Sequence, residues 1–151
     1  MNNKYYTVCG IVEIEEKVLL VRHTYGTAKD RILLPGGYVR ENEMPTAAAE
    51  REIFEETKVT AKAKSVAAVQ FKPCQWCVVF KMEYISGTPV SDGYENSEAL
   101  LIDPREAIGR ADITNMSREI LKAYINGSPM LDKSGYIPVS ADENCYAIFG
   151  V

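Results

Sequence analysis

The stretch from Gly37 to Val59 reads GYVRENEMPTAAAEREIFEETKV, and it decides how the rest of the chain is interpreted. Pro45 has no backbone N–H to donate, which suits the first turn of a helix. The residues that follow, up to Thr57, include many strong helix formers and no helix breaker. We therefore predict one helix of about three turns in this stretch.

Three glutamates of this helix, Glu52, Glu55 and Glu56, are three and four positions apart. At about 3.6 residues per turn, this spacing places them on one side of the helix. Like charges so placed destabilise a helix by about 0.2–0.5 kcal/mol per pair, so a hard divalent cation such as Mg²⁺ between them would relieve the repulsion. Glutamate-rich helical faces are more often solvated surface, and these residues alone would favour that alternative.

The residues around the three glutamates favour a metal site over a solvated helix face. Five residues separate Gly37 from Glu43, seven more lead to Arg51, and Arg51 is followed by Glu-Ile-Phe-Glu-Glu-Thr-Lys-Val. This pattern resembles the Nudix box, with Pro35-Gly36 also in place and with Lys58 where the family has glycine. A glycine just past a helix commonly adopts a left-handed conformation, so Lys58 must tolerate or avoid it.

The resemblance implies an α+β fold, the Nudix α/β/α sandwich with a mixed β-sheet between helices. It implies a Nudix hydrolase domain over residues 1–127, and we expect residues 128–151 to form a C-terminal extension that packs on the same domain.

The resemblance also assigns roles within the box. Glu52, Glu55 and Glu56 would be catalytic and would bind the metal, with Gly37 as a further ligand through its carbonyl. Gly36 and Gly37 would contact substrate. Arg51 would pair with Glu43 to hold the loop against the helix, which is a structural role.

The resemblance further implies an acid from the loop before the second helix, where Glu95 and Glu98 are both suitably placed. We prefer Glu98 slightly as the additional catalytic residue, and either could equally be a solvated loop carboxylate. The general base therefore stays open between Glu95, Glu98 and a glutamate of the box.

Outside the box, Arg22 and Arg31 are candidates to neutralise substrate phosphates, although surface solvation is the alternative for each. Trp76 or Tyr38 would stack on a base, although strand aromatics are more often core. His23, the only histidine, is expected to be a loop surface residue.

The resulting hypothesis is a pyrophosphohydrolase that cleaves a nucleoside diphosphate linked to another moiety, using Mg²⁺ or, as a substitute, Mn²⁺. A nucleoside triphosphate and a nucleotide sugar such as ADP-ribose both stay open as the small-molecule substrate. The alternatives are a non-catalytic nucleotide-sensing module on the same fold and the isopentenyl diphosphate isomerase branch of the superfamily.

Composition limits the other classes of function. A net charge of -4 argues against a broad nucleic-acid surface, and 46% hydrophobic with 25% charged residues is ordinary for a globular domain. No apolar run is long enough for a membrane helix, and the start, Met1 to Lys4, lacks the apolar core of a secretory signal. We expect a cytoplasmic protein and leave a homodimer open.

The four cysteines, Cys9, Cys74, Cys77 and Cys145, are interpreted as thiols of a reducing cytosol. The spacing of Cys74 and Cys77 also fits a redox motif or half a zinc site, but the chain has no second such pair.

Hydrophobic periodicity predicts the remaining elements. We expect a hairpin (5–14 with 18–21), a short strand (32–34) that ends at a sharp Pro-Gly-Gly turn, and two paired strands (65–71 with 76–80). A short helix after Asp103 (104–108) and an amphipathic helix (116–124) that ends near Asn126-Gly127 follow. The tail has weak β character (136–139 with 146–149).

Overall fold

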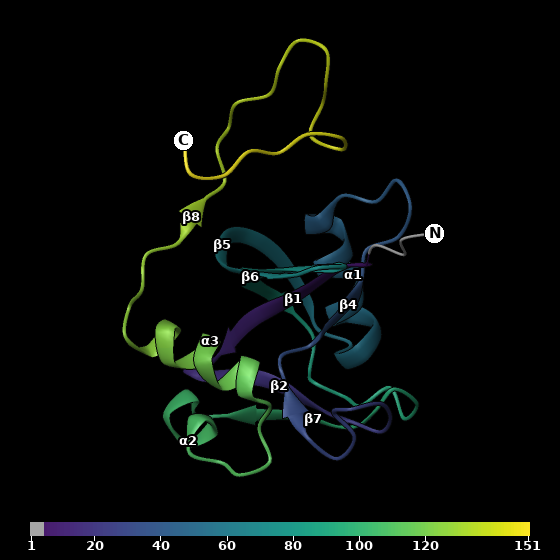
Figure 1. Cartoon of the computed structure of the whole chain (residues 1–151), viewed down its shortest axis with the longest axis vertical. Helices are drawn as coiled ribbons and strands as arrows, with labels where there is room; N and C mark the ends of the chain where they lie inside the picture. The colour runs from purple at the N-terminus through teal and green to yellow at the C-terminus, as the bar shows by residue number, and fades with distance from the viewer. Residues whose placement is uncertain (1–4) are drawn as a thin grey trace.

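The computed structural model describes residues 5–151, and a mixed β-sheet forms its centre (Figure 1). The strands are β1 (Tyr5–Ile14), β2 (Lys17–His23), β3 (Ile32–Leu33), β4 (Gly36–Tyr38), β5 (Thr60–Lys72), β6 (Gln75–Ser86), β7 (Asn96–Ile102) and β8 (Leu131–Asp132). Their order is β3-β2-β1-β6-β5-β8, with β4 paired to β1 and β7 to β2. Strands β1 and β6 run parallel, which makes the sheet mixed. Met1 to Lys4, whose composition argued against a secretory signal, lie outside the described residues.

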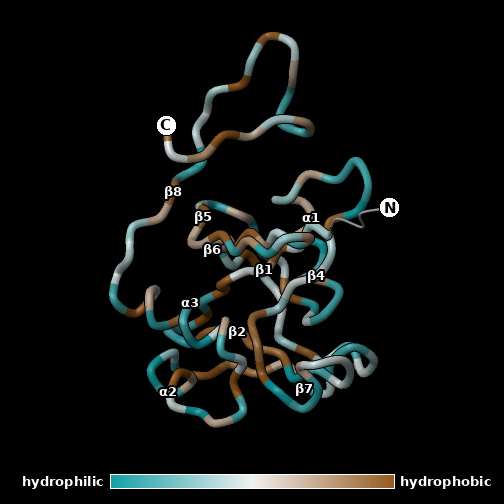
Figure 2. Tube along the Cα trace, in the orientation of Figure 1, coloured by the Kyte–Doolittle hydropathy of each residue, from teal (hydrophilic) through white to brown (hydrophobic). Residues whose placement is uncertain are grey.

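Three helices cover the two faces of the sheet within residues 5–151: α1 (Pro45–Thr57) on one face, and α2 (Pro104–Ile108) and α3 (Asn115–Ile125) on the other. Because successive strand residues point to opposite faces, Val12 of β1 packs in the core that contains Ile53 of α1. Ile11 packs in the core that contains Leu121 of α3. Figure 2 shows hydrophobic residues along these strands and polar ones in the outer loops. The predicted sandwich is confirmed.

The ends of the helices follow the predicted signals. Pro45 stands in the first turn of α1, and the Asp103 carboxylate caps α2 by accepting a hydrogen bond from the Arg105 N–H at 2.8 Å. Lys58 ends α1 in the left-handed conformation, with φ 62°, and its N–H donates to the Phe54 carbonyl. The Lys58 ammonium lies 5.6 Å from the centroid of the Phe54 ring, a contact that offsets part of the cost of that conformation.

The Pro-Gly-Gly stretch is not the sharp turn that we predicted. Gly36 and Gly37 are extended in β4 and pair with β1. A Cβ atom on Gly36 would lie 2.0 Å from the Val8 carbonyl oxygen. Glycine is therefore required here by close approach to neighbouring backbone rather than by a turn.

Two segments differ from the expected pattern. Residues 96–102, for which no strand was predicted, form β7 along β2, because strand pairing stabilises a run whose own periodicity is weak. In the tail, the strand forms at Leu131–Asp132, with a bridge between Lys133 and Phe149, rather than at 136–139. The division of the chain at residue 127 stays a prediction. Within the described residues, no helix is both long and apolar enough to cross a bilayer.

Candidate active site

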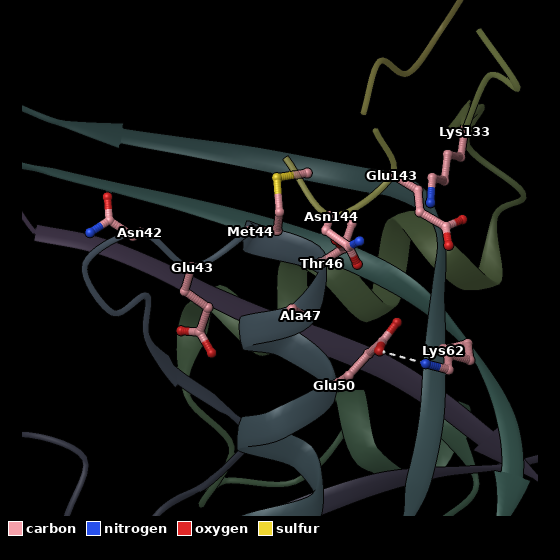
Figure 3. Close-up of a pocket in the computed structure, with 10 residues that line it drawn as sticks. All are labelled: Asn42, Glu43, Met44, Thr46, Ala47, Glu50, Lys62, Lys133, Glu143 and Asn144. Atoms are coloured by element: carbon pink, nitrogen blue, oxygen red, sulfur yellow. Dashed lines mark hydrogen bonds and ion pairs between the residues drawn. The ribbon is translucent and has the colours of Figure 1, made fainter. Parts of the chain in front are cut away.

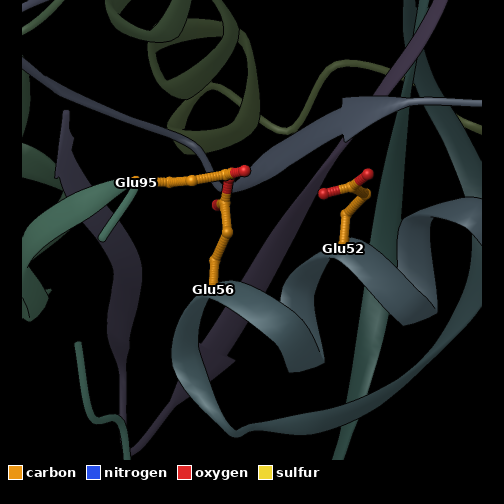
Figure 4. A group of neighbouring side chains, drawn as sticks. All are labelled: Glu52, Glu56 and Glu95. Carbon is orange, nitrogen blue, oxygen red and sulfur yellow. The ribbon is translucent and has the colours of Figure 1, made fainter. Parts of the chain in front are cut away.

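Three glutamates meet beside the C-terminal half of α1 (Figure 4). Glu52 and Glu56 project from successive turns of the helix, and Glu95 reaches toward them from the segment before β7. One carboxylate oxygen from each lies within 4.8 Å of the others. Oxygen donors at this separation can share one hard cation.

Burial and mutual repulsion both act on these acids. Glu56 is only 2% exposed, and burial raises its pKa to about 9, with further contributions from Glu52, Glu95 and Asp92. The Gly36 N–H, which donates to Glu56 at 3.3 Å, acts in the opposite direction. The pKa of Glu95 is also raised, first by burial and then by Glu52 and Asp92. The site therefore disfavours negative charge unless a cation is present.

The backbone of β4 passes directly against the carboxylates. A Cβ atom on Gly37 would lie 2.5 Å from the Glu52 carboxyl carbon. Any larger residue at this position would displace Glu52, so the glycine keeps open the space beside the acids.

Arg51 holds the loop before α1 to the helix. Its guanidinium donates two hydrogen bonds to Glu43, at 2.7 and 2.9 Å, and one to the Tyr38 carbonyl at 3.0 Å. It also reaches Glu52 at 2.8 Å, which orients that carboxylate. The Arg51 guanidinium lowers the pKa of Glu43, so the pair stays ionised. The contact that the resemblance implied between Arg51 and Glu43 is present.

Glu55 lies outside the group of three acids. Its side chain is 48% exposed and pairs with Arg40 and Arg51. On a helix, the residue at i+4 is rotated by about 40° from residue i and the residue at i+3 by about 60° in the other direction, so Glu56 stays nearer to Glu52 than Glu55 does around the axis. A direct role for Glu55 in metal binding stays a prediction.

Our preference for Glu98 over Glu95 changes with the structure. Glu98 belongs to β7, opposite Arg22 of β2, and the two side chains form an ion pair. The sequence interpretation treated both glutamates as loop residues, whereas the strand begins between them. We therefore move the candidate acid from Glu98 to Glu95.

The two arginines proposed for phosphate binding are engaged within the fold. Arg22 also donates to Asp112 at 3.0 Å and to the Asp30 carbonyl at 2.8 Å. Arg31 donates to the Ile113 carbonyl at 2.7 Å. Arg22 is held by two carboxylates and a carbonyl, whereas Arg31 donates through one amino group and its Nε is buried without a hydrogen-bond partner among the described residues. A phosphate role for either residue stays a prediction.

Both aromatic candidates, Trp76 and Tyr38, are more than half exposed. Trp76 on β6 packs edge-on against Tyr6 and Phe71. Tyr38, next to Gly37, is 61% exposed. Tyr25, which the sequence interpretation missed, stacks on His23 at 5.4 Å, and the nearby carboxylates of Glu95 and Glu56 contribute, after burial, to raising its pKa. His23 ends β2 rather than lying in a loop.

The rival cysteine site does not assemble. Cys74 is exposed in the β5–β6 turn, whereas Cys77 is buried in the sheet core with Cys9. Two cysteines so divided between solvent and core do not present a shared zinc site.

A pocket of about 460 Å³ lies at the N-terminal half of α1 (Figure 3). It is bordered by Thr46, Glu50 and Lys62, and by Glu143 of the tail. Glu50 and Lys62 form an ion pair across it at 3.0 Å. The three acids lie toward the other end of the helix, so this pocket is separate from them.

The described geometry agrees with what comparison with known proteins finds. A family model, the NUDIX domain, matches residues 4–124. The chain belongs to the Nudix family. Nudix hydrolases generally use divalent metal ions, and the three glutamates offer the oxygen ligands that such ions prefer.

Individual relatives agree with this membership. The chain is 33% identical over 102 residues to an ADP-ribose pyrophosphatase of Methanocaldococcus jannaschii, a match that covers 64% of this chain and 60% of the relative. The chain thus spans about three-fifths of that relative's length.

Solved Nudix structures resemble the whole domain. A NUDIX hydrolase from Nitrosomonas europaea superposes with a TM-score of 0.77 at 27% identity, covering 85% of this chain and 73% of that one. A MutT protein from Methanosarcina mazei Go1 has a TM-score of 0.73 at 22% identity, covering 83% and 96%, and supports the fold alone.

Proposed function

We propose that this chain is a metal-dependent hydrolase that cleaves a nucleoside diphosphate linked to another moiety. The observation that carries the proposal is the convergence of Glu52, Glu56 and Glu95 within 4.8 Å, beside a β4 backbone that has no side chain at Gly36 or Gly37. Membership of the Nudix family and the named activity of the archaeal relative support the reaction class.

The donor set fits Mg²⁺, with Mn²⁺ as a substitute, because all three groups are carboxylates and one of them is buried among like charges. Glu52 and Glu56 would hold the ion, with Glu95 and the Gly37 carbonyl as further candidates. A divalent cation, when bound, polarises the phosphoryl group and lowers the pKa of a bound water.

The protein's own groups would perform the remaining tasks. Glu95 would accept the proton of the attacking water, because its carboxylate lies beside the two acids of α1 and comes from a different segment of the chain. The bare backbone at Gly36 and Gly37 would let the diphosphate approach the acids. Arg51 would keep Glu52 in place while its own charge stays paired with Glu43.

The substrate is a nucleotide in this proposal. Exposed aromatic rings stand on two segments that build the site, Tyr38 next to Gly37 and Tyr25 next to Thr24, whose N–H donates to the Glu95 carbonyl. An exposed ring beside a diphosphate site offers a stacking surface for a base. ADP-ribose and nucleoside triphosphates are both included. A cytoplasmic location and a homodimer stay predictions.

To test this, the protein is incubated with a panel of nucleoside triphosphates and nucleotide sugars and with Mg²⁺ or Mn²⁺. Phosphate release is measured with and without added phosphatase. We expect hydrolysis of at least one compound, loss of activity in EDTA, and a fall of about 10²–10⁴-fold in kcat for Glu56→Gln. Glu50→Gln, on the same helix but paired with Lys62, is the matched control and should stay near wild type.

Two results would contradict the proposal. Turnover that Glu56→Gln leaves unchanged would remove Glu56 from the site. Binding of nucleotides without hydrolysis of any would instead support the nucleotide-sensing module.

A further inference from the structure

We propose that Asn96 is a positioning residue that holds Glu95 against Glu56 by fastening the 88–95 loop to the end of α1. This inference rests on the proposed function, because it gives Asn96 its role through Glu95. Asn96 touches neither substrate nor reacting atoms in this account.

The contacts of Asn96 join the two segments that carry the acids. Its side chain is fully buried, and the Nδ2 group donates to the Glu56 carbonyl oxygen at 2.9 Å. Its N–H donates to the Asp92 carboxylate at 3.0 Å, and its carbonyl accepts from the Ser91 hydroxyl at 2.8 Å. The same residue is thus tied to its own loop through the backbone and to the helix through the side chain.

The end of α1 explains why the loop attaches there. The last carbonyls of a helix have no partner within it and must be satisfied from outside. Asn96 supplies a donor to the Glu56 carbonyl, and the Val90 N–H supplies one to the Thr57 carbonyl at 2.9 Å. The loop therefore caps the helix at two successive residues, and its position is fixed relative to the Glu56 side chain.

This attachment fixes a cluster of acids in place. Glu95 and Glu56 come from segments far apart in the chain, and their carboxylates lie within 4.8 Å of each other only because the loop is held at the end of α1. Asn96 is adjacent to Glu95 in the chain, and its short amide leaves the loop little freedom. Without it, Glu95 would move away from Glu56.

The variants that test this are Asn96→Ala, the isosteric Asn96→Asp, Glu95→Gln and the double variant of Glu95→Gln with Asn96→Ala. A small misplacement of a catalytic group can cost up to about 10²-fold, and Asn96 would position Glu95, the proposed general base. We therefore expect a fall of about 10–100-fold in kcat for Asn96→Ala, with KM within about 3-fold. The dissociation constant for Mn²⁺, measured by calorimetry without substrate, should rise. Ser97→Ala, the exposed neighbour on β7, is the control.

The double variant separates positioning from general damage. If Asn96 acts through Glu95, removing it adds little once Glu95 is gone, so the double variant should match Glu95→Gln within about 3-fold. Effects that multiply would overturn the proposal. Full activity of Glu95→Gln would instead show that the catalytic role proposed for Glu95 is wrong.

A measurement on the metal-free protein tests the fastening without any activity. In EDTA, amide hydrogen exchange at Val90 and Tyr94 should accelerate in Asn96→Ala, while exchange at Leu121 in the core should not change. Unchanged exchange in the loop would refute the inference even if activity fell. If Asn96→Ala does not fold, Asn96→Asp and Ser91→Ala test the same fastening at its two ends.

Discussion

Glu95 and Glu98 are three residues apart, yet they end in opposite electrostatic surroundings. Glu98 pairs with Arg22, which also binds Asp112, and Arg110 completes this network of alternating charges. Glu95 instead meets two further glutamates, Glu52 and Glu56. One group of acids is neutralised by the protein itself, and the other is left with an excess of negative charge.

The pKa values of the two groups of acids are shifted in opposite directions. The guanidinium groups of Arg110 and Arg22 hold the pKa of Asp112 well below its usual range, whereas burial and like charges raise the pKa of Glu56 to about 9. Acids that stabilise the fold pair with arginine side chains of the same chain. Acids without enough neighbouring arginines are suited to bind a cation from solution.

The largest expected effect separates the two glutamates by activity. Glu95→Gln should lower kcat by about 10²-fold, because the proposed general base is lost, while Glu98→Gln should keep kcat within about 3-fold of wild type. Steady-state kinetics at saturating Mg²⁺ measure both. Equal losses of kcat in the two variants would contradict the different roles proposed for Glu95 and Glu98.

The next effect concerns stability without metal. Glu56 has a raised pKa when folded, so its ionisation opposes folding increasingly as the pH rises from about 4.5 to about 9. Glu56→Gln should therefore stabilise the metal-free protein by about 1–3 kcal/mol at pH 7, and the gain should disappear below pH 4.5. Urea unfolding in EDTA across this pH range measures it. With added Mg²⁺, the wild type should become more stable than Glu56→Gln, since the ion stabilises only a protein that binds it.

The smallest expected effect is a loss of stability, and it concerns the ion pairs that join Asp112 to Arg22 and Arg110. Asp112 has a lowered pKa, so its contribution is present above its ordinary pKa of 3.8 and is lost as the pH falls further. Asp112→Asn should cost about 1 kcal/mol at pH 7, a modest value because the side chain is 32% exposed. The difference from wild type should shrink below pH 3.8 and in high salt. A cost that does not change with pH would mean that the ion pairs contribute nothing.

Prediction from sequence succeeded where the determinants are local. Pro45, the run of helix formers and the glutamate spacing lie within one helix, so periodicity was enough to predict the helix and to place Glu52 and Glu56 together. Glu55, which was predicted with them, pairs instead with Arg40 and Arg51. The choice between Glu95 and Glu98 could not be made from local pattern, because it depends on where β7 begins, which pairing with β2 decides. Asn96 offered no signal, since a single asparagine before a strand has many ordinary uses.

By itself, the sequence determined the helix of the box and the acids that it carries, because spacing along a regular element fixes direction. The sandwich of helices on a mixed sheet was implied by the resemblance of the box to the Nudix family. The tertiary structure alone decided that Glu95 joins those acids, that Arg22 and Arg31 are used within the fold, and that Gly36 and Gly37 serve close approach rather than a turn. These outcomes depend on contacts between residues distant in the chain, and local pattern carries no information about which of them meet.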